Sequence, residues 1–284
     1  MNLDLSSLKI IKELFLKYDV RPSKGMGQNF LVNKAVLEKI IKTADLKLGD
    51  TVLEVGPGVG TLTQELAKNA ESVIAIEKDK KMCEILNETL SDFKNVKIIN
   101  GDILKTNIEL QKKYKLVANI PYYLTSPLIR KFLENPPDGK QPEEIILMVQ
   151  KEVAQRICSK PPNMSILAVS VQFYAEVKII SYIKKENFWP KPKVDSAIIK
   201  ITPHKNAPLV SVELFFKIVK AGFSQPRKQL VNNLSFLKLA NDVKLTKDEI
   251  FDWLSKNKIT PTQRAETLSI DDWINLTNSF QNIL

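Results

Sequence analysis

Apolar residues divide the chain into two parts with different periodicity. Up to about residue 205, short runs rich in Val, Ile and Leu alternate with segments whose apolar residues recur every three or four positions. The runs predict buried strands, and the segments between them predict amphipathic helices. The expected strands lie at residues 51–55, 73–76, 96–99, 115–119, 144–150, 177–183 and 197–201. Strands that alternate with helices indicate an α/β fold with a mostly parallel sheet.

After residue 206 the strand pattern stops and only helical patterns remain. We therefore predict one domain over residues 1–205 and a small all-α domain over residues 206–284. The expected helices of the first domain cover residues 5–18, 34–43, a stretch that ends near 69, 151–156 and 163–174. Those of the second cover residues 212–223, 228–237, 247–255 and 271–281.

The stretch from Lys115 to Tyr123 joins an apolar strand to a polar end. Pro121 ends the strand, because proline has no N–H to donate to a ladder. Asn119 and Tyr122 thus follow the carboxyl end of a strand, where open α/β sheets bind ligands. A carboxamide and a flat aromatic face suit a planar ring that carries an amino group. On residues 119–122 alone, a simple strand-ending turn explains the sequence equally well.

A glycine-rich turn follows the first predicted strand. Residues 51–63 read Thr-Val-Leu-Glu-Val-Gly-Pro-Gly-Val-Gly-Thr-Leu-Thr. Gly56 and Gly58 allow the backbone to approach a ligand closely, and the following helix offers free N–H groups at its N-terminus. The turn is not a P-loop, because no Gly-Lys-Ser/Thr follows. Its spacing also differs from the Gly-x-Gly-x-x-Gly of dinucleotide-binding folds.

Acidic residues follow the next two strands. Glu77 ends the second strand and is placed to accept both hydroxyls of a ribose. Asp102 follows the third strand and can accept a hydrogen bond from an adenine amino group. Because the carboxyl ends of parallel strands meet at one edge, the glycine turn, both acids and Asn119 together predict a nucleoside site there.

Residues 25–31, Gly-Met-Gly-Gln-Asn-Phe-Leu, place two side-chain amides after a glycine pair. Gln28 and Asn29 each carry a donor and an acceptor, which suits a ligand that has both a carboxylate and an ammonium group. Taken alone, the segment is also explained as an ordinary loop.

The net charge of +10 is concentrated in one block. Residues 151–250 hold 17 Lys and Arg against 8 Asp and Glu, a net charge of +9. A basic excess this localised predicts a polyanion partner, of which phosphate backbones are the most common. A merely lysine-rich composition would spread the charge more evenly.

Other features make several protein classes improbable. No apolar run approaches the ~20 residues of a membrane span, and residues 1–12 lack the pattern of a secretory signal. Cys83 and Cys158 are far apart and are expected to be free thiols in a reducing cytoplasm. With a single histidine, His204, and no Cys-x-x-Cys pair, we expect no metal site.

The order of these motifs resembles the class I S-adenosylmethionine-dependent methyltransferases. Within that class, residues 119–122 (Asn-Ile-Pro-Tyr) and 27–31 (Gly-Gln-Asn-Phe-Leu) resemble the ribosomal RNA adenine dimethyltransferase family. Residues 188–196 are similar to the family's Phe-x-Pro-x-Pro-Lys-Val-Asp-Ser signature, and residues 232–234 and 264–269 to its later Asn-Asn-Leu and Arg-Ala-Glu-x-Leu-Ser. This resemblance implies a Rossmann-like catalytic domain followed by a small all-α domain that binds RNA.

The resemblance also implies a role for each site residue. The residues expected to bind S-adenosylmethionine are Gln28, Asn29, Leu31, Gly56, Gly58, Glu77, Asp102 and Asn119. The expected catalytic residues are Asn119, which would also contact the target amino group, and Tyr122 and Phe188, which would stack on the adenine. The expected RNA-binding residues are Lys191, Lys193, Arg227 and Lys228, the last two at a basic helix start.

An adenine amino nitrogen is a poor nucleophile, because its lone pair is delocalised into the ring. Acceptors at its two hydrogens, the Asn119 side chain and a backbone carbonyl near Ile120-Pro121, would favour a tetrahedral nitrogen with an available lone pair. Positioning and electrostatics then supply the catalysis, and no strong base is required. The target base must leave its stack to enter such a pocket.

By resemblance, the expected activity is dimethylation of two adjacent adenosines in the 3′-terminal hairpin loop of small-subunit (16S) rRNA. We expect a cytoplasmic monomer that acts on this RNA or on an immature small ribosomal subunit, with no membrane partner. One alternative is a large-subunit rRNA adenine methyltransferase of the macrolide-resistance type. Another is a non-catalytic ribosome-assembly or transcription factor on the same fold.

Overall fold

The structure is a computed structural model that describes residues 3–23, 25–110, 113–206, 208–237 and 245–280. The chain divides into two compact units. The first comprises Met1–Ala154 and Glu176–Pro203, and the second Gln155–Ala175 and His204–Leu284. The second unit therefore includes residues 155–175, which the sequence prediction placed in the first domain.

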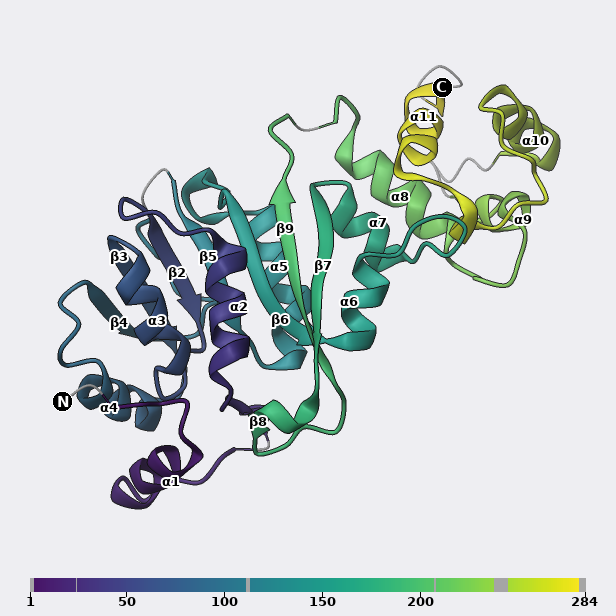
Figure 1. Ribbon diagram of the computed structural model, residues 1–284. Coiled ribbons are helices and arrows are strands. Elements are labelled where there is room, and N and C mark those ends of the chain that lie inside the picture. The colour runs from purple at the N-terminus through teal and green to yellow at the C-terminus, as the bar shows by residue number, and fades with distance from the viewer. Residues whose placement is uncertain (1–2, 24, 111–112, 207, 238–244, 281–284) are drawn as a thin grey trace. The chain divides into compact units, whose positions relative to one another are not determined.

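The first unit is built on a seven-stranded sheet, which confirms the predicted α/β fold (Figure 1). Its strands lie in the order β4-β3-β2-β5-β6-β9-β7. Neighbours from β4 to β6 are parallel, whereas β9 runs antiparallel to β6. The bounds are β2 (Thr51–Val55), β3 (Ser72–Glu77), β4 (Val96–Asn100), β5 (Lys115–Asn119), β6 (Glu144–Gln150), β7 (Ala175–Ile183) and β9 (Ser196–Pro203).

Helices cover both faces of this sheet (Figure 1). They are α2 (Lys34–Ala44), α3 (Thr61–Asn69), α4 (Lys80–Thr89) and α5 (Thr125–Glu134). Helix α1 (Leu8–Lys17) instead packs in a separate apolar cluster with Phe30 and with Met82 of α4. Leu37 of α2 and Leu66 of α3 are buried in one apolar cluster with Val117 of β5, as the helical spacing of apolar residues requires. Asn33 caps α2 by accepting a hydrogen bond from the Val36 N–H at 3.2 Å.

A separate two-stranded ribbon joins two distant motifs. β1 (Phe30–Leu31) pairs antiparallel with β8 (Phe188–Trp189), so that Leu31 lies opposite Phe188. The sequence prediction placed both segments in loops, because two residues are too few to show a strand periodicity. The ribbon holds the Gly-Gln-Asn-Phe-Leu segment beside the Phe-Trp-Pro segment.

The second unit is all-helical in its described part after residue 206. Its helices are α7 (Ile166–Gln172), α8 (Val212–Gly222), α9 (Leu230–Leu234), α10 (Lys247–Lys256) and α11 (Ile270–Phe280), and α6 (Lys151–Ile157) crosses from the first unit into the second. Phe215, Trp253 and Trp273 are fully buried in its core. Residue 281 of the last predicted helix lies outside the described residues.

Two predicted helices of this unit are shorter than expected. The helix predicted over residues 163–174 begins only at Ile166, because the Ser165 side chain caps it through the Ala168 N–H. The helix predicted over residues 228–237 is α9, which begins at Leu230. Arg227 and Lys228 thus lie in the turn between α8 and α9, which corrects the prediction that they start a helix.

Candidate active site

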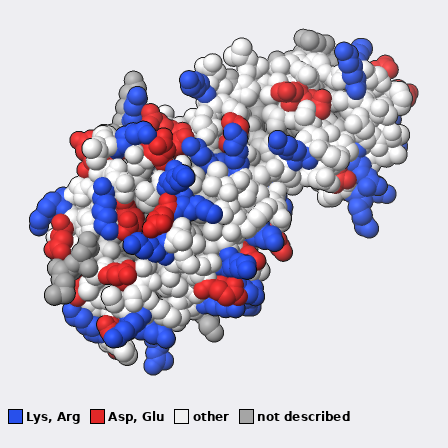
Figure 2. Space-filling view, viewed as in Figure 1, with Lys and Arg blue, Asp and Glu red and all other residues white. Residues whose placement is uncertain are grey.

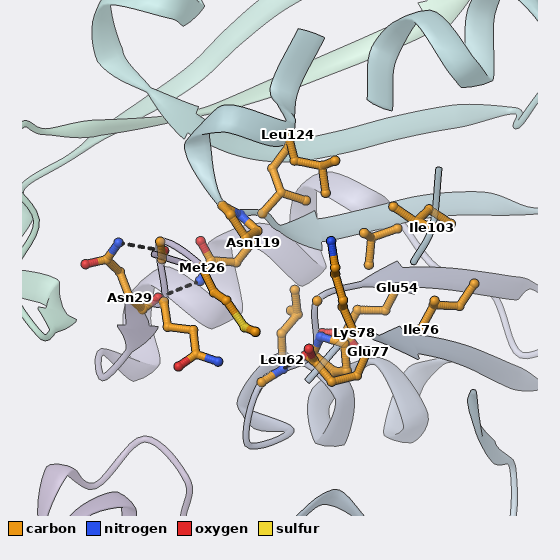
Figure 3. A pocket seen from close by; sticks show the side chains of 18 of the residues that line it. Met26, Asn29, Glu54, Leu62, Ile76, Glu77, Lys78, Ile103, Asn119 and Leu124 are labelled. Carbon is orange, nitrogen blue, oxygen red and sulfur yellow. Dashed lines mark hydrogen bonds between the residues drawn. The ribbon is translucent and has the colours of Figure 1, made fainter. Parts of the chain in front are cut away.

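One pocket at the carboxyl edge of the sheet gathers every residue predicted to bind the cofactor or act in catalysis. These residues are Gln28, Asn29, Leu31, Gly56, Gly58, Glu77, Asp102, Asn119, Tyr122 and Phe188. Figure 3 shows Asn29 and Asn119 at one end of the pocket and Glu77 and Lys78 at the other. The pocket therefore follows the ends of β2, β3, β4 and β5 in turn.

The glycine turn after β2 and the acid that ends β3 are directly bonded. The Gly58 N–H donates to Glu77 Oε2 at 3.1 Å, and the Asp79 N–H donates to Glu77 Oε1 at 2.8 Å. Gly58 has a φ of +62°, and a Cβ there would lie 2.9 Å from a ring carbon of Phe30. Burial raises the pKa of Glu77, against the opposing effect of its backbone hydrogen bonds.

Asp102 forms an ion pair at the same end of the pocket. Its Oδ2 lies 3.0 Å from Lys78 Nζ, and its Oδ1 accepts the Leu104 N–H at 3.0 Å. The hydrogen bond from Lys78 is the main cause that lowers the Asp102 pKa, so the carboxylate is ionised at neutral pH. Sequence reasoning missed Lys78, although it directly follows Glu77.

Asn119 is held by the segment that precedes β1. Its Nδ2 donates to the Asn29 backbone carbonyl at 3.2 Å, and Asn29 Nδ2 in turn donates to the Gly27 carbonyl at 3.0 Å (Figure 3). No donor within the described parts of the chain bonds to the Asn119 side-chain oxygen. The amide is thus oriented by its nitrogen while its oxygen remains an acceptor.

Tyr122 and Phe188 approach the pocket from different elements. Tyr122 begins a short 3₁₀ turn, Tyr122–Leu124, and its hydroxyl lies 2.9 Å from Ser196 Oγ. Burial raises the pKa of Tyr122, so the phenol stays neutral at physiological pH. Phe188 is only 4% exposed and packs in the apolar cluster that contains Leu31.

The Gln28 side chain is already engaged in the structure. Its Nε2 donates to Asp79 Oδ2 at 2.9 Å, and its Oε1 accepts the Ser23 N–H at 2.8 Å. Asp79 also caps α4 by accepting the Lys81 N–H. Gln28 therefore ties the 25–29 segment to the start of α4 as well as lining the pocket.

Glu54 is a pocket residue that sequence reasoning did not select. It is 1% exposed, and its Oε2 has no hydrogen-bond partner among the described residues. Burial raises the pKa of Glu54 to about 8, and the nearby Glu77 carboxylate adds to the shift. The available signal was a single acid within a mostly apolar strand, two residues before Gly56.

The basic residues predicted to bind RNA lie outside the pocket lining. Lys191 Nζ is 2.6 Å from Glu186, whereas Lys193 is exposed and has no acidic partner within the described residues. Arg227 and Lys228 are both exposed. Asn233, from the Asn-Asn-Leu motif, donates to the carbonyls of Gly222 and Gln225 at 2.6 and 3.0 Å and so fixes their turn.

No helix among the described residues has both the length and the hydropathy of a membrane span. No group of three or more His, Cys, Asp or Glu side chains in that part of the chain is placed to hold a metal ion.

Comparisons with known proteins show the family to which the chain belongs. The model of the ribosomal RNA adenine dimethylase family matches residues 21–282. A ribosomal RNA small subunit methyltransferase A from Dehalococcoides mccartyi (strain CBDB1) is 44% identical over 268 residues, which cover 92% of this chain and 89% of the relative.

Solved structures agree as well. A dimethyladenosine transferase from Plasmodium falciparum superposes with a TM-score of 0.74 and 29% identity, over 89% of this chain and 98% of its own. The 23S rRNA methyltransferase ErmE superposes with a TM-score of 0.71 and 25% identity, over 89% of this chain and 99% of its own. The chain therefore belongs to the ribosomal RNA adenine dimethylase family, a group of S-adenosylmethionine-dependent methyltransferases.

Proposed function

We propose that the protein transfers methyl groups from S-adenosylmethionine to the 6-amino groups of two adjacent adenosines in the 3′-terminal hairpin loop of small-subunit rRNA. The observation that carries this proposal is the Asn119 amide, oriented by the Asn29 carbonyl with its oxygen left as an acceptor at the pocket. An acceptor fixed in this way suits an amino group that must be aligned for transfer. The reaction takes place in the cytoplasm, where ribosomal subunits are assembled.

The residues of the pocket fit a positively charged nucleoside cofactor. Gly58, whose N–H donates to Glu77, keeps the turn in a left-handed conformation close to the Phe30 ring, and Glu77 and Asp102 supply carboxylates at the end where ribose and adenine would lie. The unpartnered Oε2 of Glu54 offers a further buried acceptor. When bound, S-adenosylmethionine supplies an electrophilic methyl group on its sulfonium sulfur.

The chain's own residues would align the target rather than remove a proton from it. Asn119 Oδ1 and a backbone carbonyl near Ile120 and Pro121 accept hydrogen bonds from the amino group, which favours a nitrogen with an available lone pair. Tyr122 presents its ring with the hydroxyl tethered to Ser196. Phe188 is held rigidly by its pairing with Leu31, so that it can bound the opposite side of the base. Fixed geometry of this kind lowers the entropic part of the barrier.

Glu77→Ala is expected to weaken S-adenosylmethionine binding by about 1–3 kcal/mol, the range for a lost hydrogen bond to a charged group. Isothermal titration calorimetry measures this directly, once circular dichroism has shown that the variant is folded. Glu84→Ala is the matched control, because Glu84 is an exposed acid on the neighbouring helix α4. Equal affinities for Glu77→Ala and wild type would remove Glu77 from the cofactor site.

The small subunit is favoured over the large subunit by the relatives. The small-subunit relative is 44% identical, whereas the superposed 23S rRNA methyltransferase is 25% identical. Purified protein and labelled S-adenosylmethionine can be incubated with small and large subunits from a strain that lacks the modification. We expect label in small-subunit RNA, and label confined to large-subunit RNA would support the alternative instead.

The turn before α9 is the second unit's candidate phosphate contact. Arg227 and Lys228 are exposed, and neither has an acidic partner within the described residues. Figure 2 shows that basic and acidic side chains are interspersed over the first unit on the face drawn, whereas Arg227 and Lys228 are two adjacent cations. Phosphate contacts position RNA without reading its sequence, and their strength falls with salt.

Replacing Arg227 and Lys228 together with Ala is expected to weaken RNA binding. The slope of log affinity against log salt should decrease by about 1.5, because each lost phosphate contact contributes roughly 0.7–0.9. Affinity for S-adenosylmethionine should not change. The control is the double variant Lys247→Ala, Lys256→Ala, which removes two exposed charges from α10. Identical salt dependence in both double variants would place the phosphate contacts elsewhere.

A further inference from the structure

We propose that Tyr182 and Lys151 form a stacking site for a nucleotide that flanks the methylated adenosine. The inference rests on the proposed function, because it concerns the same RNA. Tyr182 lies on β7 and is 51% exposed, unusual for an aromatic residue of a sheet. Lys151 Nζ lies over its ring, 5.3 Å from the centroid. Ile180, which is 40% exposed and two residues earlier on the same face, extends the apolar surface.

Hydrogen bonds connect this surface to the wall of the pocket. The Lys151 N–H donates to the Asp195 carbonyl at 3.0 Å. Asp195 precedes Ser196, whose hydroxyl is 2.9 Å from that of Tyr122 in the pocket. The Lys185 N–H donates to Asp195 Oδ1 at 3.1 Å, so the end of β7 is held beside the start of β9. Tyr182 therefore lies toward the same edge of the sheet as the pocket, and hydrogen bonds through Asp195 and Ser196 connect the two.

The charges around Tyr182 suit a nucleic acid. Lys184 and Lys193 are exposed, and neither has an acidic partner among the described residues. Lys178, by contrast, is paired with Glu176 at 2.9 Å. The ammonium groups of Lys151, Lys184 and Lys193 thus remain available to phosphates on either side of a stacked base.

The proposed reaction creates a need for such a site. An adenosine that enters the pocket must leave its stack, and its neighbours in the loop lose a stacking partner at the same time. An exposed aromatic ring can replace that partner, and base–aromatic stacking of this kind does not depend on sequence. The occupant is therefore a single-stranded nucleotide of the substrate loop.

The test compares Tyr182→Ala, Tyr182→Phe and the control Leu48→Ala in methylation assays on unmodified small subunits. Leu48 is 83% exposed and precedes β2 at the opposite edge of the sheet. Tyr182→Ala should raise the KM for the subunit by about 5- to 150-fold, from the strength of one base–aromatic stack. Tyr182→Phe keeps the ring and should stay within about twofold of wild type, as should Leu48→Ala. The affinity for S-adenosylmethionine should be unchanged in all three.

A second arm leaves the protein unchanged and alters the RNA. Hairpin RNAs that lack one base, at each position next to the target adenosines in turn, are titrated with wild type and Tyr182→Ala. At one position, loss of the base should weaken binding of the RNA to wild type but should not weaken its binding to Tyr182→Ala any further. The inference is overturned if Tyr182→Ala has the same KM as wild type, or if both proteins are equally sensitive at every abasic position. Either result would suit a protein partner for this surface. If wild type methylates no rRNA, the proposed function itself fails.

Discussion

Asn119→Ala is expected to reduce the single-turnover rate of methyl transfer by about 10²–10³-fold, the usual effect of removing one positioned hydrogen-bonding group from a reacting centre. The physical reason is the geometry of the amide. Its nitrogen is fixed on the Asn29 carbonyl, so the oxygen of this pocket-lining amide is held in one direction. Alanine removes this acceptor and leaves no other side chain in its place.

The measurement is a rapid-quench assay under saturating cofactor and RNA, with cofactor affinity determined separately. This separation is needed because Asn119 also lines the cofactor part of the pocket, so some of the loss can appear as weaker binding. Asn69→Ala, at the last residue of α3, is the matched control. A variant at Asn119 that retains near wild-type single-turnover rate would remove this residue from the mechanism.

Glu54→Gln is expected to stabilise the protein at pH 8 relative to wild type by an amount on the order of 3–5 kcal/mol. Burial raises the pKa of Glu54 from 4.5 to about 8 in the folded protein. Between these two values the folded state binds more protons than the unfolded state, so wild-type stability falls as the pH rises through this window. Below the unfolded pKa the carboxyl is protonated in both states, and the two proteins should then have similar stability.

Urea unfolding of both proteins without cofactor, at pH values from 4 to 9, measures this difference. The introduced carboxamide has the shape of the neutral Glu54 carboxyl but does not titrate. The free energy of unfolding of the variant should therefore fall much less with rising pH than that of wild type. Glu77, whose pKa is also raised by burial, is present in both proteins, so part of the fall in stability with rising pH should persist in the variant. Parallel stability curves would mean that Glu54 does not carry a raised pKa.

The sheet could be predicted from the sequence because each strand has its own apolar run. The strand ends then placed the glycine turn, Glu77, Asp102 and Asn119 at one edge, and the structure brings all of them into one pocket. Parallel topology makes this step reliable, since every strand contributes its carboxyl end to the same side. The order of motifs along the chain was therefore sufficient to predict that these residues lie together at one pocket.

Contacts between distant segments could not be predicted in the same way. The pairing of Leu31 with Phe188 joins two strands of two residues, which carry no periodicity. The ion pair of Asp102 with Lys78 and the hydrogen bond of Gln28 to Asp79 also depend on tertiary structure. Glu54 was visible as an acid in an apolar strand, but its missing partner is evident only in the folded protein.

The most direct test of the account is the chemical identity of the product. Small subunits from a strain that lacks the modification are incubated with the protein and S-adenosylmethionine, and the RNA is digested and analysed by mass spectrometry. We expect dimethyladenosine from two adjacent positions of the 3′-terminal hairpin loop, and far slower formation of it with Asn119→Ala. Methylation at another base or another atom, or no transfer by wild type to any ribosomal RNA, would contradict it.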